Sequence, residues 1–288
     1  MNTLKTISDS IYEICFNADT QIAGYSESDS AIWAKANSLR HAHTIRAILD
    51  YAERSNKKNL KILNASGPGC GHQDFSIVSF LRNHTSLDIE WVAFENPDSW
   101  FHTTDSFKKY QKDLGIRLEL SDFSKTAKPY GEGEEIYDIV LFTEIAQQID
   151  HSTLLTALIK IREKMKNDGI LIVTTANLVE LKNRIRILFG NGDGPYWSDT
   201  PKTTKHRHGM YGHIVSYDIN RLQRLMRDLG YATDKAYTFT YGYGPGEKVF
   251  IKRVINGVLD FMSIFIKNSR TTLFIIATKT REGLNDQK

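Results

Sequence analysis

The sequence predicts an α/β fold in which a largely parallel sheet carries helices on both faces. A short apolar run, Ile62–Leu63, is followed by glycines at alternate positions and then by a helical stripe of Phe75, Val78 and Leu81. Further apolar runs at 89–94, 116–120, 139–142 and 170–173 alternate with helical patterns. Alternation of this kind requires crossover connections, and these produce a doubly wound sheet.

The composition is that of an ordinary folded protein, with 41% hydrophobic and 25% charged residues among 288. A formal net charge of +3 is too small to indicate nucleic-acid binding by itself. The two cysteines, Cys15 and Cys70, lie far apart and lack metal-ligand spacing, which favours a reducing compartment. Because neither a signal peptide nor a membrane span is predicted, we expect a cytoplasmic protein.

Residues 1–58 are expected to form a helical extension outside the sheet. Simple packing accounts for most of its apolar positions, such as Ala36, Ile45 and Ile48. A leading segment of this kind can also close over a ligand as a lid. The candidates for such contacts are Tyr25, Trp33, Arg40 and His43.

The turn after the first strand carries Gly67, Gly69 and Gly71. Glycines allow a sharp turn and a close approach of a ligand, and the following helix start offers free N–H groups. A dinucleotide fingerprint needs G-x-G-x-x-G, but His72 stands where its third glycine belongs. The pattern therefore favours another nucleotide-like ligand, although glycine clusters also make plain turns.

Acidic residues follow the second and third predicted strands. Glu95 ends the run 89–94 and lies 24 residues beyond Gly71, where this fold holds ribose hydroxyls. Asp122 follows the run 116–120 and could accept from an adenine amino group, with Phe123 stacking on the base. The alternatives are a surface carboxylate for Glu95 and a helix cap or turn for Asp122.

The stretch 137–177 combines a buried strand, an irregular crossing at Thr143–Ile149, a helix and another strand. Leu154, Leu158, Ile161 and Met165 form the predicted helical face. Asn167–Asp168–Gly169 then predicts a turn into the strand Ile170–Val173.

These motifs resemble the class I S-adenosylmethionine-dependent methyltransferases. The glycines resemble motif I, Tyr137–Asp138 with Glu144 resembles the fourth strand, and Met165–Leu171 resembles the entry into the fifth. Residues 211–217 with the leucines after them resemble a segment of methyltransferases encoded with sugar and polysaccharide biosynthesis genes. The resemblance covers roughly residues 60–240.

The resemblance implies a Rossmann-like, doubly wound, seven-stranded sheet with an antiparallel last strand, and S-adenosyl-L-methionine as cofactor. The sequence departs from the pattern of the family at three places: Asn64 or Ala65, where an acidic residue is usual, Gln147–Gln148, and Ser216. These departures weaken any inference of the substrate from the family. The implied cofactor-binding residues are Asn64, Ser66, Gly67, Gly69, Gly71, Glu95, Asn96, Asp122, Phe123, Thr143, Glu144 and Gln147.

Residues 59–180 would be the cofactor-binding core, and 181–235 an insertion on the substrate side. The insertion begins with a basic amphipathic helix at 181–189 and continues as a long loop, which could equally be a solvated insertion. Its histidines lack a specific metal-ligand pattern, so no metal is predicted and a general base is favoured, His213 first and His208 second. The candidate substrate residues are Tyr196, Trp197, Lys205, His206, Arg207 and Tyr211.

Residues 236–288 would complete the same domain. Ala236–Tyr241 and Thr271–Thr278 are the expected antiparallel strands, with an amphipathic helix at Val249–Ile266 between them. That helix is interpreted either as a core-facing or dimer-forming element, or as an interfacial membrane helix with basic flanks.

The leading hypothesis is an O-methyltransferase of a sugar, glycan precursor or other small polar metabolite. The basic loop would suit an anionic acceptor, and an interfacial C-terminal helix would suit a lipid-linked one. The alternatives are a nicotinamide-dependent oxidoreductase or epimerase on a related fold, and a non-catalytic cofactor-binding module. No nucleic-acid partner is expected, because the basic residues are local rather than spread over a broad face.

Overall fold

The computed structural model describes residues 3–21, 26–66, 72–95, 103–120, 136–189, 215, 217–240 and 250–280. Contacts divide the chain into two compact units, Met1–Leu141 with Tyr241–Lys248, and Phe142–Thr240 with Val249–Lys288. These units do not coincide with the four segments expected from the sequence, whose boundaries stay a prediction.

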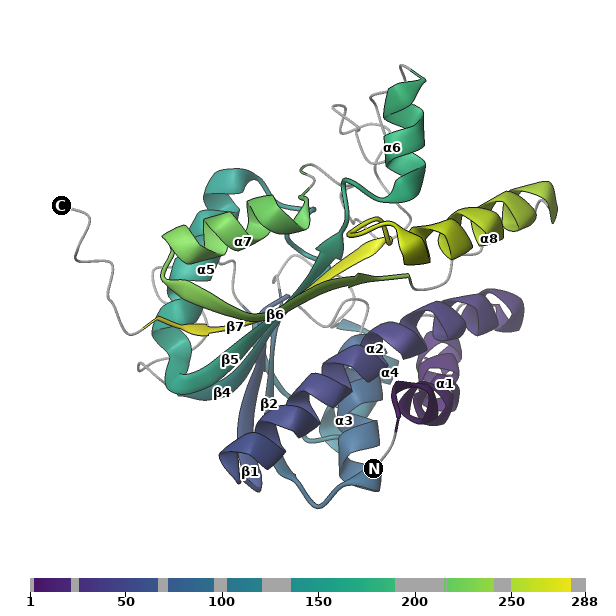
Figure 1. The fold of residues 1–288 in the computed structure, drawn as a ribbon. Helices are drawn as coiled ribbons and strands as arrows, with labels where there is room; N and C mark the ends of the chain where they lie inside the picture. The colour runs from purple at the N-terminus through teal and green to yellow at the C-terminus, as the bar shows by residue number, and fades with distance from the viewer. Residues whose placement is uncertain are drawn as a thin grey trace. The chain divides into compact units, whose positions relative to one another are not determined.

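The first unit opens with two helices, α1 (Leu4–Gln21) and α2 (Glu27–Ser55), in the segment expected to be helical (Figure 1). Strands and helices then alternate as predicted. The elements are β1 (Asn59–Asn64), α3 (His72–His84), β2 (Asp88–Glu95), α4 (Asp105–Asp113), β3 (Arg117–Leu120) and β4 (Tyr137–Thr143), whose last two residues belong to the second unit.

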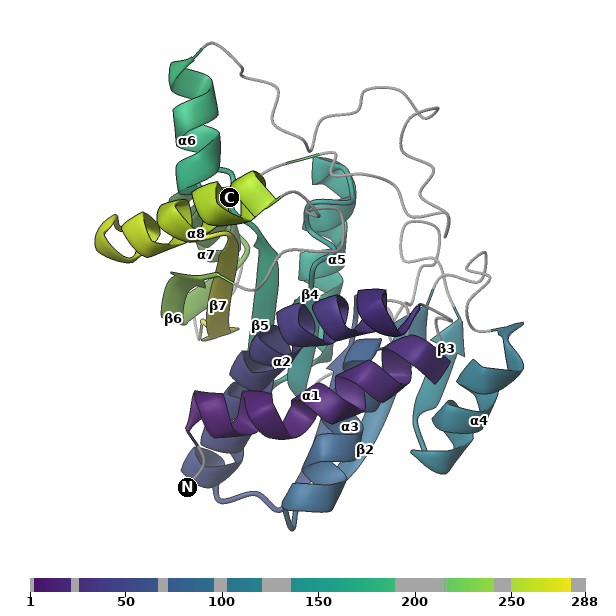
Figure 2. The same ribbon diagram turned by 90° about the vertical axis from the view of Figure 1, so that its right-hand side faces the viewer.

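The second unit continues the alternation and ends with an antiparallel strand pair (Figure 2). Its helix α7 packs against strand β6, and helices α6 and α8 contact each other. The elements are α5 (His151–Lys164), β5 (Met165–Ala176), α6 (Leu181–Leu188), α7 (Ile219–Asp228), β6 (Tyr231–Phe239), α8 (Phe250–Phe265) and β7 (Thr272–Lys279).

The strands form one seven-stranded sheet in the order β3-β2-β1-β4-β5-β7-β6. β1 pairs in parallel with β2 and β4, and β2 pairs in parallel with β3. β7 is antiparallel to both of its neighbours, β5 and β6. The mixed, doubly wound sheet with an antiparallel last strand is therefore confirmed.

Short polar side chains cap the N-termini of several helices. Ser26 accepts a hydrogen bond from Asp29 N at 3.2 Å, and Asp150 accepts one from Thr153 N at 3.0 Å. Asp218 accepts from both Asn220 N and Arg221 N at 2.9 Å. Each cap satisfies N–H groups that the first helical turn leaves without a partner.

The core of the sheet is centred on β4, in which all seven residues are buried. A strand flanked by strands on both edges and covered on both faces has no solvent side, so its sequence is continuously apolar rather than alternating. Phe75, Val78 and Leu81 of α3 are buried as predicted.

Two details of the prediction are wrong. The expected turn at Asn167–Gly169 does not exist, because β5 begins at Met165, directly after α5. Met165 already has an extended backbone (φ −72°, ψ 142°), so it is the first residue of the strand instead of the last of the helical face. Asn167 and Asp168 are exposed within the strand, and this gave the sequence the appearance of a turn.

Strand β6 also begins five residues earlier than expected, at Tyr231 instead of Ala236. Its pairing with β7 shifts register between Thr233 and Lys235, where the ladder is irregular. A bulge of this kind interrupts the alternation of apolar and polar residues on which the prediction depended.

Candidate functional site

The turn that leaves β1 is fixed by the side chain of Asn64, which is fully buried. Its Oδ1 accepts hydrogen bonds from Ser66 N at 3.1 Å and from Ser66 Oγ at 2.9 Å. Ala65 N donates to Leu141 O of β4 at 2.8 Å. Asn64 and Ser66 thus hold the backbone immediately before the glycine-rich stretch that begins at Gly67.

Asp74, in the first turn of α3, completes this arrangement. Its Oδ1 accepts from Asn64 Nδ2 at 2.7 Å and from Trp91 Nε1 of β2 at 2.9 Å. Burial raises the pKa of Asp74 to about 7; the hydrogen bonds from Asn64 and Trp91 oppose the shift, and the charge of Glu95 adds to it. The buried Oδ2 has no hydrogen-bond partner in the part of the chain that the structure describes.

Asp74 was missed in the sequence because the motif of the family places its acidic residue before the glycines, where this chain has Asn64. The structure brings a carboxyl group into hydrogen-bond contact with Asn64 from the helix that follows the turn. An acidic residue in the first turn of a helix was the available indication, since helix starts favour negative charge.

Glu95 is the last residue of β2 and is half-buried. β1 and β2 pair in parallel with Asn64 opposite Ala93, so Glu95 lies at the same edge of the sheet as the turn after β1. Its charge acts on Asp74. The structure thus brings Asn64, Ser66 and Glu95 together at one edge, as predicted for a ligand site in this fold.

Helices α1, α2 and α3 pack together through an interface that includes polar groups. Cys15 Sγ of α1 lies 3.5 Å from Nδ1 of the fully buried His41, and burial raises the pKa of the Cys15 thiol to about 12. Of the predicted lid residues, Trp33, Arg40 and His43 are half-buried. Burial lowers the pKa of His43 to about 4, so its imidazole is neutral at neutral pH.

In the second unit, Glu144 follows β4 in an unusual backbone conformation with φ of 57°. Its N–H donates to Thr174 O of β5 at 2.8 Å. Its carboxylate accepts from Thr174 Oγ1 at 2.9 Å and from Gln147 Nε2 at 3.1 Å. A non-glycine residue held at positive φ by surrounding bonds is a feature that gathers at functional sites.

Gln147 links the same loop to the chain that returns from the insertion. Its side chain is buried, and its Oε1 accepts from Thr175 Oγ1 at 2.6 Å. Its backbone O accepts from Val215 N at 3.3 Å. Tyr217 then forms a bridge with Asn177, next to the end of β5. Val215 therefore contacts the loop after β4, and Tyr217 lies beside the end of β5.

Thr143, the last residue of β4, is buried. The remaining predicted site residues lie outside the described residues, so their contacts stay predictions. They are Tyr25, Gly67, Gly69, Gly71, Asn96, Asp122, Phe123, Tyr196, Trp197, Lys205, His206, Arg207, His208, Tyr211 and His213. Within the described ranges, no three histidine, cysteine, aspartate or glutamate side chains gather in a way that could hold a metal ion.

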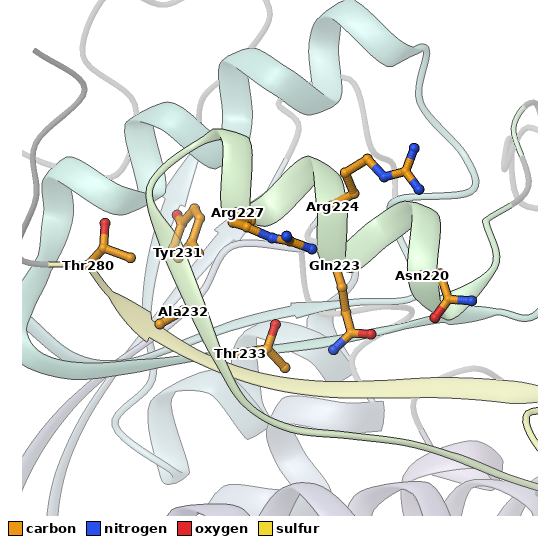
Figure 3. A pocket seen from close by; sticks show the side chains of 8 residues that line it. All are labelled: Asn220, Gln223, Arg224, Arg227, Tyr231, Ala232, Thr233 and Thr280. Atoms are coloured by element: carbon orange, nitrogen blue, oxygen red, sulfur yellow. The ribbon is translucent and has the colours of Figure 1, made fainter. Parts of the chain in front are cut away.

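A surface pocket of about 600 Å³ lies between α7 and the start of β6 (Figure 3). Gln223, Arg224 and Arg227 line it from the helix, and Tyr231 and Thr233 line it from the strand. None of the residues predicted for cofactor or substrate lines it. The pocket is therefore separate from the candidate site.

Similar architectures occur among solved structures. The chain aligns with a SAM-dependent methyltransferase from Archaeoglobus fulgidus at a TM-score of 0.50 and 15% identity, covering 92% of this chain and 99% of that one. A SAM-dependent methyltransferase from Methanosarcina mazei aligns at 0.52 and 13% identity, covering 82% and 98%. The fold is that of the class I methyltransferases.

The same fold is shared by a protein of different chemistry. The [4+2]-cyclase SpnF aligns at a TM-score of 0.51 and 13% identity, covering 97% of both chains. No model of a protein family matches the sequence, and no curated protein matches it either. The similarity therefore establishes the architecture, and the chemistry has to be argued from the residues.

Proposed function

We propose that the protein is an S-adenosylmethionine-dependent methyltransferase that methylates a hydroxyl group of a sugar, a glycan precursor or another small polar metabolite. One observation carries the proposal. The Asn64–Ser66 turn leads into the glycine-rich stretch at the strand edge where Glu95 ends the neighbouring strand. This is where open α/β sheets bind nucleotide-like ligands.

The residues present fit such a cofactor. Glu95 can accept two hydrogen bonds from ribose hydroxyls, and we assign the contacts with the methionine part to backbone N–H groups of the glycine-rich stretch that follows Ser66. Bound S-adenosylmethionine supplies an electrophilic methyl group on a positively charged sulfur. We assign the rest of the cofactor contacts to Gly67, Gly69, Gly71, Asn96, Asp122 and Phe123, and those near the methyl group to Thr143, Glu144 and Gln147.

Proton removal from the acceptor is assigned to His213. An alcohol must lose its proton as it attacks, and histidine titrates near neutrality. Val215, two residues after His213 in the sequence, donates its N–H to Gln147 O in the loop after β4. His208 is the second candidate. Tyr196, Trp197, Lys205, His206, Arg207 and Tyr211 are proposed to contact the acceptor.

Calorimetric titration with S-adenosylhomocysteine tests the cofactor assignment, with NAD as the parallel ligand. We expect S-adenosylhomocysteine alone to bind, and Glu95→Ala to weaken its binding by about tenfold or more through the loss of charged hydrogen bonds. Glu90→Ala, on the same strand, is the matched control and should leave the affinity unchanged. Binding of NAD would support an oxidoreductase. If neither ligand bound, the protein would be a module of another kind.

A further inference from the structure

The exposed apolar side chains of this protein are concentrated on two helices of the second unit. Ten large apolar side chains are exposed in the described part of the chain, and eight of them belong to the end of α6 or to α8. Leu188 and Phe189 at the end of α6 are 82% and 80% exposed, and Phe265 of α8 is 75% exposed. A concentration of this kind marks an interaction surface, whereas scattered apolar residues do not.

On α8 the exposed residues follow helical spacing. Val258, Phe261, Met262 and Phe265 recur at three- and four-residue intervals and form one stripe. The rings of Phe261 and Phe265 contact each other with centroids 5.3 Å apart. The stripe is thus a continuous apolar face on the outside of the helix.

Hydrogen bonds hold the start of α6 to the chain that leaves α8. Leu181 N donates to Ser269 O at 2.8 Å, and Arg184 Nη2 donates to Lys267 O at 3.3 Å. α6 has eight residues and therefore rises only about 11 Å from this junction to its apolar end. The two helices with their apolar residues are here called the α6–α8 surface (Figures 1 and 2).

The charges around the α6–α8 surface are mostly positive. Residues 179–189 and 257–270 contain five lysines and arginines against two acidic residues, Glu180 and Asp260. Glu180 is buried, and Lys267 is exposed beside the apolar stripe. In a symmetric dimer this surface would face its own copy, so its like charges would oppose each other. An anionic surface complements it instead.

We propose that the α6–α8 surface docks the protein on an anionic membrane surface, with the aromatic and aliphatic side chains entering the headgroup region. Apolar residues beside lysine and arginine are the combination that binds such interfaces. Among the described helices, α8 included, none has the length and hydropathy needed to cross a bilayer. The surface therefore lies on the membrane and does not span it.

Vesicle flotation of the full chain tests the proposal. We expect the protein to float with phosphatidylcholine vesicles that contain about a third phosphatidylglycerol, and to be released as salt rises from about 0.05 M to 0.5 M, because screening weakens the charge attraction. Binding to neutral phosphatidylcholine should be weaker. Failure to float with the anionic vesicles at low salt would overturn the proposal, and this measurement requires no variant.

Two variants locate the contact. Phe261→Ser with Phe265→Ser should reduce the vesicle partition coefficient by about tenfold for each phenylalanine. The matched control, Leu120→Ser with Ile159→Ser, removes exposed apolar residues elsewhere and should bind as the unaltered chain does. Equal binding by both double variants would overturn the assignment. Concentration-dependent dimers lost in the phenylalanine variant, without vesicle binding, would make a second copy the occupant.

Discussion

Asn64 Nδ2 donates to Asp74 Oδ1 at 2.7 Å, and this bond joins the end of β1 to the first turn of α3 across the glycine-rich stretch. The same oxygen accepts from Trp91 Nε1. One carboxyl group therefore ties the two segments that flank the stretch to the neighbouring strand β2.

Replacing Asp74 by alanine should destabilise the protein markedly. Two buried donors, on Asn64 and Trp91, would lose their acceptor, and each such loss costs about 1–3 kcal/mol. Urea unfolding measures the change in the free energy of unfolding. Asp113→Ala, at the exposed end of α4, is the control and should change it by less than about 0.5 kcal/mol. Equal effects would show that Asp74 does not hold the turn.

The raised pKa of Asp74 predicts a pH dependence of stability. The folded state binds the proton up to a pKa of about 7, whereas the unfolded carboxyl has 3.8, so folding takes up a proton between these values. The free energy of unfolding should therefore fall as pH rises from about 4 to 7, with a contribution approaching about 1.4 kcal/mol per pH unit.

Asp74→Asn isolates this contribution. Glu180, whose pKa burial raises to about 7, contributes a slope of the same sign, whereas His43, whose pKa burial lowers to about 4, contributes one of the opposite sign as pH rises from 4 to 6.5. Because these two contributions oppose each other, the slope in the variant should lie much closer to zero than that of the unaltered protein. Urea unfolding of both proteins from pH 4.5 to pH 7 gives the two slopes. Identical slopes would mean that Asp74 is ionised in the folded protein throughout this range.

The positive φ of Glu144 predicts an order among three substitutions. Glu144→Ala and Glu144→Gly both remove the carboxylate that accepts from Thr174 and Gln147. Only alanine, however, carries a Cβ at φ of 57°, which costs about 1–2 kcal/mol. Glu144→Gly should therefore be more stable than Glu144→Ala. Glu144→Gln keeps an acceptor for Thr174, so it should also be more stable than Glu144→Ala. The midpoints of thermal unfolding rank the three variants. A higher midpoint for Glu144→Ala than for Glu144→Gly would contradict the strain argument.

Replacing two of the glycines by alanine should change the free energy of unfolding in opposite directions. Gly230 has φ of +78°, and a Cβ there would lie 2.9 Å from Arg162 Nε, which donates to Gly230 O. Gly230→Ala should cost about 1–2 kcal/mol. A Cβ on Gly257 in α8 meets nothing within 4 Å, so Gly257→Ala should stabilise by about 0.5–1 kcal/mol. Chemical denaturation of both variants measures the difference in sign.

His213→Ala should lower turnover by about 10²–10⁴-fold while the dissociation constant for S-adenosylhomocysteine stays unchanged. A methyl-transfer assay with candidate acceptors and calorimetry supply the two readouts. His84→Ala, at the exposed end of α3, is the control and should affect neither. Undiminished turnover in His213→Ala would discard the base assignment and direct the same test to His208.

The elements that the sequence predicts well are those whose pattern comes from burial. Ile62–Leu63 and the run 139–142 are apolar because both faces of these strands are buried, and β1 and β4 are found there. The edge strand β6 was predicted only in part, because its bulge near Asp234 places polar residues in succession. Periodicity cannot distinguish such a bulge from a turn.

The candidate site shows the same division. The positions of Asn64, Ser66 and Glu95 could be predicted because motif spacing ties them to strand ends, and their role in binding stays a prediction. Asp74 and His41 were missed, since their role depends on which side chains of other helices and strands they meet. The positive φ of Glu144 could not be predicted from the sequence either, because glutamate has no preference for positive φ.

The position of β7 has a consequence for the order in which the chain can fold during synthesis. β7 lies between β5 and β6, although it is made after both of them. Until residue 279 leaves the ribosome, β5 lacks its antiparallel neighbour and β6 has no strand to pair with. The first unit contains β1, β2 and β3 and can begin to fold early, since domains made first fold first. In this interval the nascent second unit exposes the unpaired edge of the apolar strand β5 and leaves β6 without a partner strand, so a chaperone would have most to bind then.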